Sequence, residues 1–273
     1  MTEGTLRKMR TELVDPVHYQ LPVGEVLIDL NPLLGQEISL VYSGRIFCIE
    51  CGRKTNKSFN QGYCFPCLRR LAACDTCIVR PELCHYHEGT CREPQWGETH
   101  CMQPHVVYLA NSSGLKVGIT RKTQVPTRWI DQGAIQALAI AEVDTRLQSG
   151  LMETALKGTV NDKTDWRRML KGGQTEIDLK FEWEQLRKSS EALITDSQLQ
   201  FGASTVRLKE QEEPIRIFYP VLRYPEKIKA FNFDKEKSVR GTLEGIKGQY
   251  LILDQGVLNI RKFAGYEISF TVY

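Results

Sequence analysis

Long apolar runs are missing from this 273-residue chain, and cysteine is missing outside one short block. No segment approaches the roughly eighteen apolar residues that a membrane-spanning helix needs. The first ten residues are polar and charged, so no secretory signal peptide is expected. A net charge of +3 is too small to indicate a partner, and the apolar and charged contents are those of an ordinary globular protein. We therefore expect two or three modules, outside the membrane and in the reducing cytoplasm.

Residues 48–101 hold all nine cysteines and three of the five histidines. The first four cysteines follow the pattern Cys48-x2-Cys51, twelve residues, Cys64-x2-Cys67. Each C-x-x-C turn offers two thiolates to one tetrahedral ion, so the spacing predicts a zinc site. Gly52 lets the first turn close. Buried free thiols or a redox pair are the alternatives.

The later cysteines bring more candidate ligands than one zinc ion can use. The simplest second tetrahedral site takes Cys74, Cys77, Cys84 and one of His87, Cys91 or Cys101. An iron–sulfur cluster is the alternative, although the interleaved histidines favour zinc. A disulfide framework is disfavoured, because the number of cysteines is odd and paired C-x-x-C spacing suits metals.

Basic and aromatic residues accompany the first four cysteines. Between Arg45 and Arg70, six basic residues stand against one acid, with aromatic residues interleaved. Such a surface suits phosphate contacts and base stacking, which predicts nucleic-acid contacts at Arg53, Lys54 and Lys57. A solvated face around a structural metal is the alternative.

The stretch after the cysteines predicts strands and helices in the order ββαβα. The predicted elements are strands at 105–110, 115–120 and 135–143, and helices from about 126 to 133 and about 145 to 160. Residues 111–114 form the hairpin turn between the first two strands. Pro126 suits the first turn of the short helix, and Gly133 suits its C-terminal cap.

Residues in these elements resemble the GIY-YIG nuclease superfamily over about 55 residues. Val106-Val107-Tyr108 stands at the GIY position. Lys116-Val117-Gly118 stands at the YIG position, so a lysine replaces the second tyrosine, as the K-[IV]-G triplet does in some branches. Arg128 on the next helix and Glu153 on the last helix complete the resemblance.

The resemblance implies metal-dependent hydrolysis of a phosphodiester bond, as in an endonuclease. Glu153 would bind Mg²⁺ or Mn²⁺, and Arg128 would hold the scissile phosphate with its fork of donors. Tyr108 would assist the attacking water, and Lys116 would activate that water or contact the phosphate. In the alternative interpretation, Tyr108 is a core aromatic residue and the charged residues are solvated, because a fold does not fix a function.

Further nucleic-acid contacts are predicted beside this core. Trp129 is a candidate for lining a base pocket next to Arg128, with a buried tryptophan as the alternative. Arg167 and Arg168 are candidates for phosphate contacts, with a solvated helix face as the alternative. Asn161 stands where an asparagine occurs late in GIY-YIG domains, although its spacing from the metal-binding glutamate is short.

Short strands are predicted at both ends of the chain. Apolar residues at period two punctuated by proline mark the first 47 residues, and strands broken by Gly or Pro mark residues 201–273. One of these predicted strands covers residues 227–233. A small β-barrel completed by both ends would bring the termini together, as in barrels of the OB or SH3 type.

The chain as a whole resembles the prokaryotic DUF2797 family. The motifs that carry the resemblance are PELCHYH at 81–87, GTCREP at 89–94, WGE at 96–98 and TRWIDQGA at 127–134. The match extends over most of the chain but implies little about activity.

The sequence thus predicts an α+β protein in four parts. They are strands at 1–47, a two-zinc cysteine-rich module at 48–104, a GIY-YIG-like core at 105–200 and a β-barrel-like part at 201–273. We expect a zinc-containing protein that binds DNA or RNA; cleavage with a divalent metal is what the resemblance to GIY-YIG nucleases would add. The alternatives are a non-catalytic adaptor for RNA, a ribosome or a protein partner, and a redox or metal sensor that uses the later cysteines.

Overall fold

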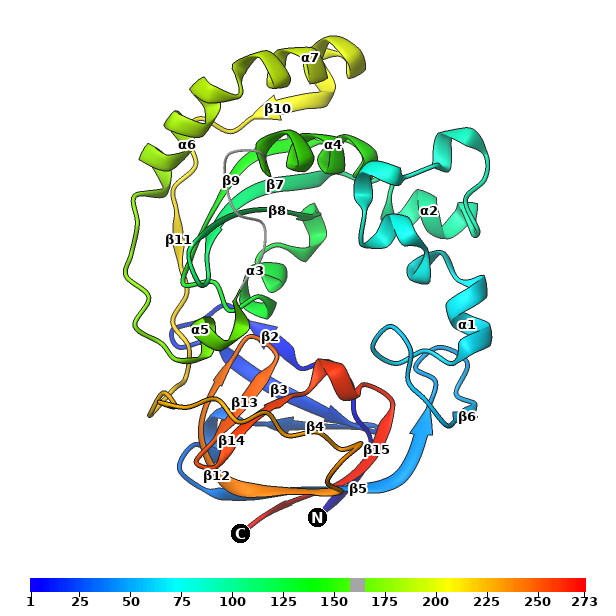
Figure 1. Cartoon of the computed structure of the whole chain (residues 1–273), viewed down its shortest axis with the longest axis vertical. Helices are drawn as coiled ribbons and strands as arrows, with labels where there is room; N and C mark the ends of the chain where they lie inside the picture. The colour runs from blue at the N-terminus through cyan, green and yellow to red at the C-terminus, as the bar shows by residue number, and fades with distance from the viewer. Residues whose placement is uncertain (158–164) are drawn as a thin grey trace.

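The computed structural model describes residues 1–157 and 165–273, which form three sheets and seven α-helices. An α/β part and a β-rich part lie at opposite ends of the molecule, and the cysteine-rich segment runs along one side between them (Figure 1). Both termini lie at the β-rich end (Figure 1). None of the described helices has the length and apolar character needed to cross a bilayer.

The largest sheet is built from both ends of the chain. Its strand order is β1 (Thr2–Thr5), β15 (Tyr266–Val272), β5 (Glu37–Phe47), β12 (Ser238–Lys247), β13 (Tyr250–Leu253) and β14 (Gly256–Asn259), and the short β6 (Lys54–Thr55) also pairs with β5. Alternate residues of β15 are buried, as expected for a strand with one face on the core. The pairing of β15 with β1 and β5 confirms that the two ends meet.

The prediction of a closed barrel is wrong. Among the described strands, β1 and β14 remain the two edges of an open sheet. Residues 227–233, predicted as a strand, make one bridge, between Ala230 and Val257. Their apolar side chains Phe231 and Phe233 are buried, so the alternation in this stretch reflects packing against the core and not a paired strand.

A second sheet covers the first. It consists of β2 (Arg10–Glu12), β3 (His18–Val23) and β4 (Val26–Asp29), all antiparallel. Fully buried side chains such as Tyr19 and Leu21 from β3 share one apolar core with Ile38 and Leu40 from β5. Each such side chain contributes about 1.5–3 kcal/mol when it leaves water.

The third sheet forms the α/β part, with strands β10 (Val206–Leu208), β9 (Gln136–Val143), β7 (His105–Asn111) and β8 (Leu115–Arg121) in that order, and β11 (Ile215–Arg216) beside β9. Strand β7 is buried throughout and has two apolar faces. Val107 and Leu109 pack under helices, whereas Tyr108 and Ala110 face the core of the β-rich part. The α/β part therefore sits directly on the β-rich part.

Helices α3 (Thr127–Asp131), α4 (Arg146–Lys157), α5 (Trp166–Leu170), α6 (Leu179–Ser189) and α7 (Glu191–Phe201) belong to this part of the chain. The order β7, β8, α3, β9, α4 agrees with the ββαβα order predicted from the sequence. The cysteine-rich segment contains α1 (Phe65–Arg70), α2 (Pro94–His100) and four short 3₁₀ turns, which are η2 (Ala72–Cys74), η3 (Thr76–Ile78), η4 (Pro81–Leu83) and η5 (Tyr86–Glu88).

Candidate metal centre and adjoining cleft

The four cysteines of the two C-x-x-C turns lie together. The sulfur atoms of Cys48, Cys51, Cys64 and Cys67 are all within 4.8 Å of one another, and we call these residues the four-thiol group. Cys48 follows strand β5, and Cys64 and Cys67 lie at the start of α1. Four free thiols at this separation suit a zinc ion, which prefers tetrahedral sulfur ligands.

The local backbone prepares these thiols for a metal. Gly52 has a φ of 69° and donates its N–H to the Cys48 carbonyl at 3.0 Å, which closes the first turn. Burial acts to raise the pKa of Cys48, but neighbouring N–H groups, including that of Cys64 at 3.3 Å, donate to its sulfur and lower the pKa to about 6. A thiolate is therefore favoured at Cys48, as a metal ligand requires.

The later cysteines divide between two places. Cys74, predicted as a ligand of a second zinc, packs against the four-thiol group. Cys77, Cys84 and Cys101 share a separate apolar cluster farther along the chain. A hydrogen bond from Cys101 lowers the pKa of Cys84 to about 6, although burial opposes this shift. A second zinc site with Cys74 among its ligands remains a prediction.

The remaining candidate ligands in this segment are the histidines and Cys91. His87 is exposed, with Glu88 at 3.8 Å as its ionic neighbour. Cys91 lies against Gly97 of α2. Asp75, Cys77 and His85 form a close triad of possible ligands, in which Asp75 is the member that the sequence did not suggest.

A cleft of about 570 Å³ opens between the α/β part, the cysteine-rich segment and the β-rich part. Three of the four predicted catalytic residues, Lys116, Arg128 and Glu153, line it. Strand β8 and helices α3 and α4 thus bring these side chains to one surface. We call this cleft the core cleft.

Tyr108 lies just beneath the wall of the core cleft and is fully buried. Its hydroxyl donates to the side-chain carbonyl of Gln132 at 3.1 Å. Burial raises its pKa to about 12, and the nearby Arg128 and Glu153 act in opposite directions, the first lowering and the second raising it. The phenol is therefore neutral near pH 7 and in electrostatic reach of both charges.

The third position of the Lys116-Val117-Gly118 triplet requires glycine for a steric reason. Gly118 is paired with Tyr108 across β7 and β8. A Cβ at this position would lie 2.7 Å from the Tyr108 ring and hydroxyl. Only glycine leaves room for the tyrosine ring over the neighbouring strand.

Glu153 projects from the middle of α4, and its side chain is 13% exposed. Lys157, one turn later, lies 3.4 Å from its carboxylate. Mg²⁺ and Mn²⁺ are bound by one or two carboxylates with water filling the remaining positions. A single, partly buried carboxylate on a cleft wall fits such an ion.

Sequence reasoning missed several basic residues of the core cleft, Arg121, Arg146 and Lys8 among them, whereas Arg261, a candidate contact from the sequence, also lines it. Burial lowers the pKa of Arg261, and the neighbouring guanidinium of Arg128 lowers it further. Burial and the neighbouring charge of Arg146 likewise lower the pKa of Arg121. Because like charges repel, two such pairs in one cleft favour an anion as their counterpart.

Helix α4 also fixes the cysteine-rich segment against the cleft. Arg146 donates to the carbonyls of Cys77 at 3.2 Å and Ile78 at 2.6 Å. Gly150 lies against Pro81 in η4, where a Cβ would come within 2.6 Å of the proline Cβ. The helix that carries Glu153 therefore also holds Ile78 and Pro81, two lining residues of the cleft from the cysteine-rich segment.

The other predicted contacts lie elsewhere. Trp129 is 2% exposed and packs edge-on against Tyr108, so it cannot stack on a base, and the alternative of a buried tryptophan is correct. The remaining predicted contacts, Arg53, Lys54, Lys57, Arg167 and Arg168, are exposed but line no part of the core cleft. Asn161 lies outside the described residues.

Comparison with known proteins gives a family for the chain. No curated protein and no solved structure matches the sequence. The family described as "Protein of unknown function (DUF2797)" matches residues 35–268, from the strand before the four-thiol group to the last strand of the large sheet. Since this match covers most of the sequence, the chain belongs to the DUF2797 family.

Proposed function

We propose that the protein binds nucleic acid in the core cleft and cleaves a phosphodiester bond there with a divalent metal ion. The observation that carries the proposal is that Arg128 and Glu153 line one cleft, with the buried, neutral hydroxyl of Tyr108 in electrostatic reach of both. The crowded arginines of the same cleft support it, because they are suited to a polyanion.

Each residue has a role that its chemistry suits. Arg128 binds two oxygens of the phosphate with its planar fork, and Arg261 beside it neutralises further charge. The Tyr108 hydroxyl donates its hydrogen bond to the Gln132 side-chain oxygen, so its own oxygen accepts a hydrogen bond from Arg128 and orients the guanidinium. Glu153 would hold Mg²⁺ or Mn²⁺, which supplies charge neutralisation and a more acidic water when bound.

The four-thiol group has a structural role in this proposal. A zinc ion there holds the loop that carries Asn60, Gln61 and Tyr63, all of which line the core cleft. Closed tetrahedral sulfur sites stabilise folds and take no part in chemistry.

Binding without cleavage is the second candidate. It is favoured by the ion pair between Glu153 and Lys157 at 3.4 Å, which already neutralises the carboxylate. In that case the cleft recognises RNA or DNA as an adaptor would.

A cleavage assay separates the two candidates. Labelled single-stranded, duplex and branched DNA and RNA are incubated with Mg²⁺ or Mn²⁺ and with wild type or Glu153→Gln. Glu184→Gln, at an exposed carboxylate of α6, is the matched control. We expect cleavage by wild type and by the control, and a loss of at least about a hundredfold in Glu153→Gln with binding retained. Binding without any cleavage by wild type would support the second candidate instead.

A further inference from the structure

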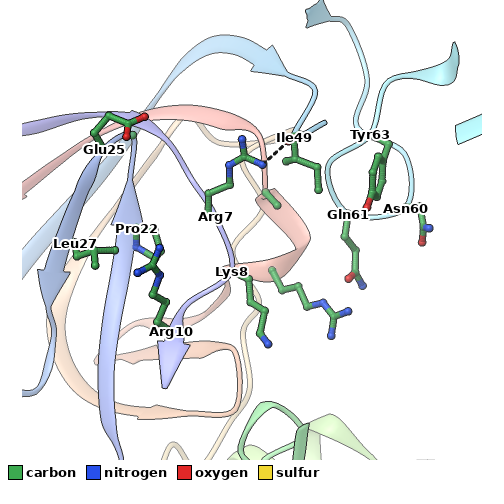
Figure 2. Close-up of a pocket in the computed structure, with 13 residues that line it drawn as sticks. Arg7, Lys8, Arg10, Pro22, Glu25, Leu27, Ile49, Asn60, Gln61 and Tyr63 are labelled. Carbon is green, nitrogen blue, oxygen red and sulfur yellow. Dashed lines mark hydrogen bonds between the residues drawn. The ribbon is translucent and has the colours of Figure 1, made fainter. Parts of the chain in front are cut away.

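A second cleft, of about 490 Å³, adjoins the core cleft. Figure 2 shows Arg7, Lys8 and Arg10 from the N-terminal segment on one side of it, and Asn60, Gln61 and Tyr63 from the four-thiol loop on the other. We call it the arginine cleft. None of its lining residues belongs to the ββαβα core.

The two clefts adjoin. They share the lining residues Lys8, Asn60, Gln61, Tyr63 and Arg261. Because these residues border both clefts, a strand that extends beyond the core cleft on this side would meet the arginine cleft next.

Charge in the arginine cleft is one-sided. Arg7, Lys8, Arg10 and Arg261 line it against the single acid Glu25. Lys8 is paired with the buried Asp131 of α3, and Arg7 donates to the Ile49 carbonyl at 2.8 Å. Arg10 is exposed and offers its full charge to a ligand. Spaced cations along a groove suit the phosphates of a nucleic-acid strand.

The tip of the four-thiol loop is strained toward this groove. Asn60 and Gln61 have φ values of 42° and 63°, in the left-handed region, which asparagine tolerates but which a residue such as Gln61 rarely adopts. Two hydrogen bonds of 2.8 Å between Phe59 and Tyr63 close the turn and hold it there. Such strain persists where the conformation serves a function, and here it directs two amide side chains and a tyrosine ring toward the groove.

We propose that the arginine cleft binds the phosphate backbone of a single strand that flanks the scissile phosphate, with Arg10 and Gln61 as specific contacts. The inference rests on the proposed function, since it extends the same groove. A cleft of this volume takes a ligand of drug size, which corresponds to a few nucleotides of single strand and not to a duplex. The protein would thus require a single-stranded extension beside the cleavage site.

Fluorescence anisotropy on zinc-loaded Glu153→Gln protein, without added Mg²⁺ or Mn²⁺, tests this inference. The probes are labelled single strands of about four and about sixteen nucleotides, and a duplex of the longer length. We expect a further Arg10→Ala change to weaken binding of the long strand about fivefold to tenfold and to lower the slope of log K against log salt by roughly one. Binding of the short strand stays unchanged, as does all binding in the control Lys235→Ala, an exposed lysine away from both clefts.

Gln61→Gly separates binding from folding. Glycine adopts the left-handed conformation without cost, so this variant keeps or raises the thermal stability of the protein. We nevertheless expect it to bind the long strand more weakly, because the amide is lost.

Three outcomes would overturn the inference. If Arg128→Ala weakens both strand lengths while Arg10→Ala and Gln61→Gly leave the long strand unaffected, the arginine cleft is not used and the proposed function stands. If the duplex binds more tightly than the single strand and depends on Arg10, the assignment to a single strand is wrong. If no probe binds at any salt concentration, the proposed function and the inference fail together.

Discussion

The four-thiol group and the core cleft beside it are built in opposite ways. The four thiols come from residues 48–67 and are brought together by local turns and by N–H donors of the same segment. The cleft takes its walls from residues as far apart as Lys8 and Arg261, which only the packing of three parts brings together. Local spacing predicts the first kind of site, whereas the second kind depends on the tertiary fold.

Removal of one thiol should have the largest effect, because a structural zinc ion stabilises its fold by about 10 kcal/mol or more. We expect Cys64→Ser to lose its zinc and to leave residues 48–71 open to trypsin, with loss of the groove wall at Gln61. Zinc per chain by mass spectrometry and the tryptic cleavage pattern measure both effects.

Cys74→Ser is the matched control for this prediction. Cys74 packs beside the four-thiol group but is not one of its four members. It should keep the zinc ion and the protease resistance. Equal zinc loss in the two variants would show that the group is not the self-contained site described above.

Acid should weaken the part of the fold that depends on tertiary packing. His105 at the start of β7 is fully buried and donates Nδ1–H to the Gln103 carbonyl at 2.6 Å. Burial lowers its pKa from 6.5 to about 4, so an unfolded chain takes up a proton near pH 6.5 that the folded chain takes up only near pH 4. The free energy of unfolding is therefore not reduced by His105 above pH 6.5. It falls by about 3 kcal/mol as the pH decreases from 6.5 to 4.

Urea denaturation at pH 7 and pH 4.5 measures this loss. His105→Leu has no group to titrate, so its stability should fall less over the same interval. An equal fall in both proteins would assign the acid sensitivity to other groups.

The Gly150→Ala change tests the packing of α4 on the cysteine-rich segment. Two effects predict opposite signs for the resulting change in the free energy of unfolding. Helix propensity alone predicts a gain of about 1 kcal/mol from alanine in a helix. The contact with Pro81 in η4 predicts a loss of about 1–3 kcal/mol, together with lower cleavage as the cleft wall moves. Thermal denaturation that shows a more stable variant would contradict the described contact.

The predictable part of the fold is the part with local patterns. The apolar run at 105–110 and the turn at 111–114 predicted strands β7 and β8, and Gly133 with a φ of 67° ends α3 as expected. The apolar pattern at residues 227–233 predicted a strand that is not formed, because such a pattern cannot distinguish strand pairing from loop packing.

The site was predictable to a similar extent. The resemblance to GIY-YIG nucleases selected Lys116, Arg128 and Glu153, which do share one cleft. Arg121 and Arg146 could not be found, because only the fold places them near each other in the cleft. The close packing at Gly150 could have been predicted from the sequence, since a glycine inside a predicted helix often indicates close packing.

Binding of Mn²⁺ by electron paramagnetic resonance is the most direct test of the account, because Glu153 is the residue on which cleavage depends. Zinc-loaded wild type and Glu153→Gln are titrated in the presence of a phosphorothioate strand that resists cleavage. We predict that wild type binds about one Mn²⁺ and that Glu153→Gln binds it at least about tenfold more weakly, with its zinc content unchanged. Equal Mn²⁺ affinity in the two proteins would contradict a metal at Glu153 and leave the cleft as a binding surface alone.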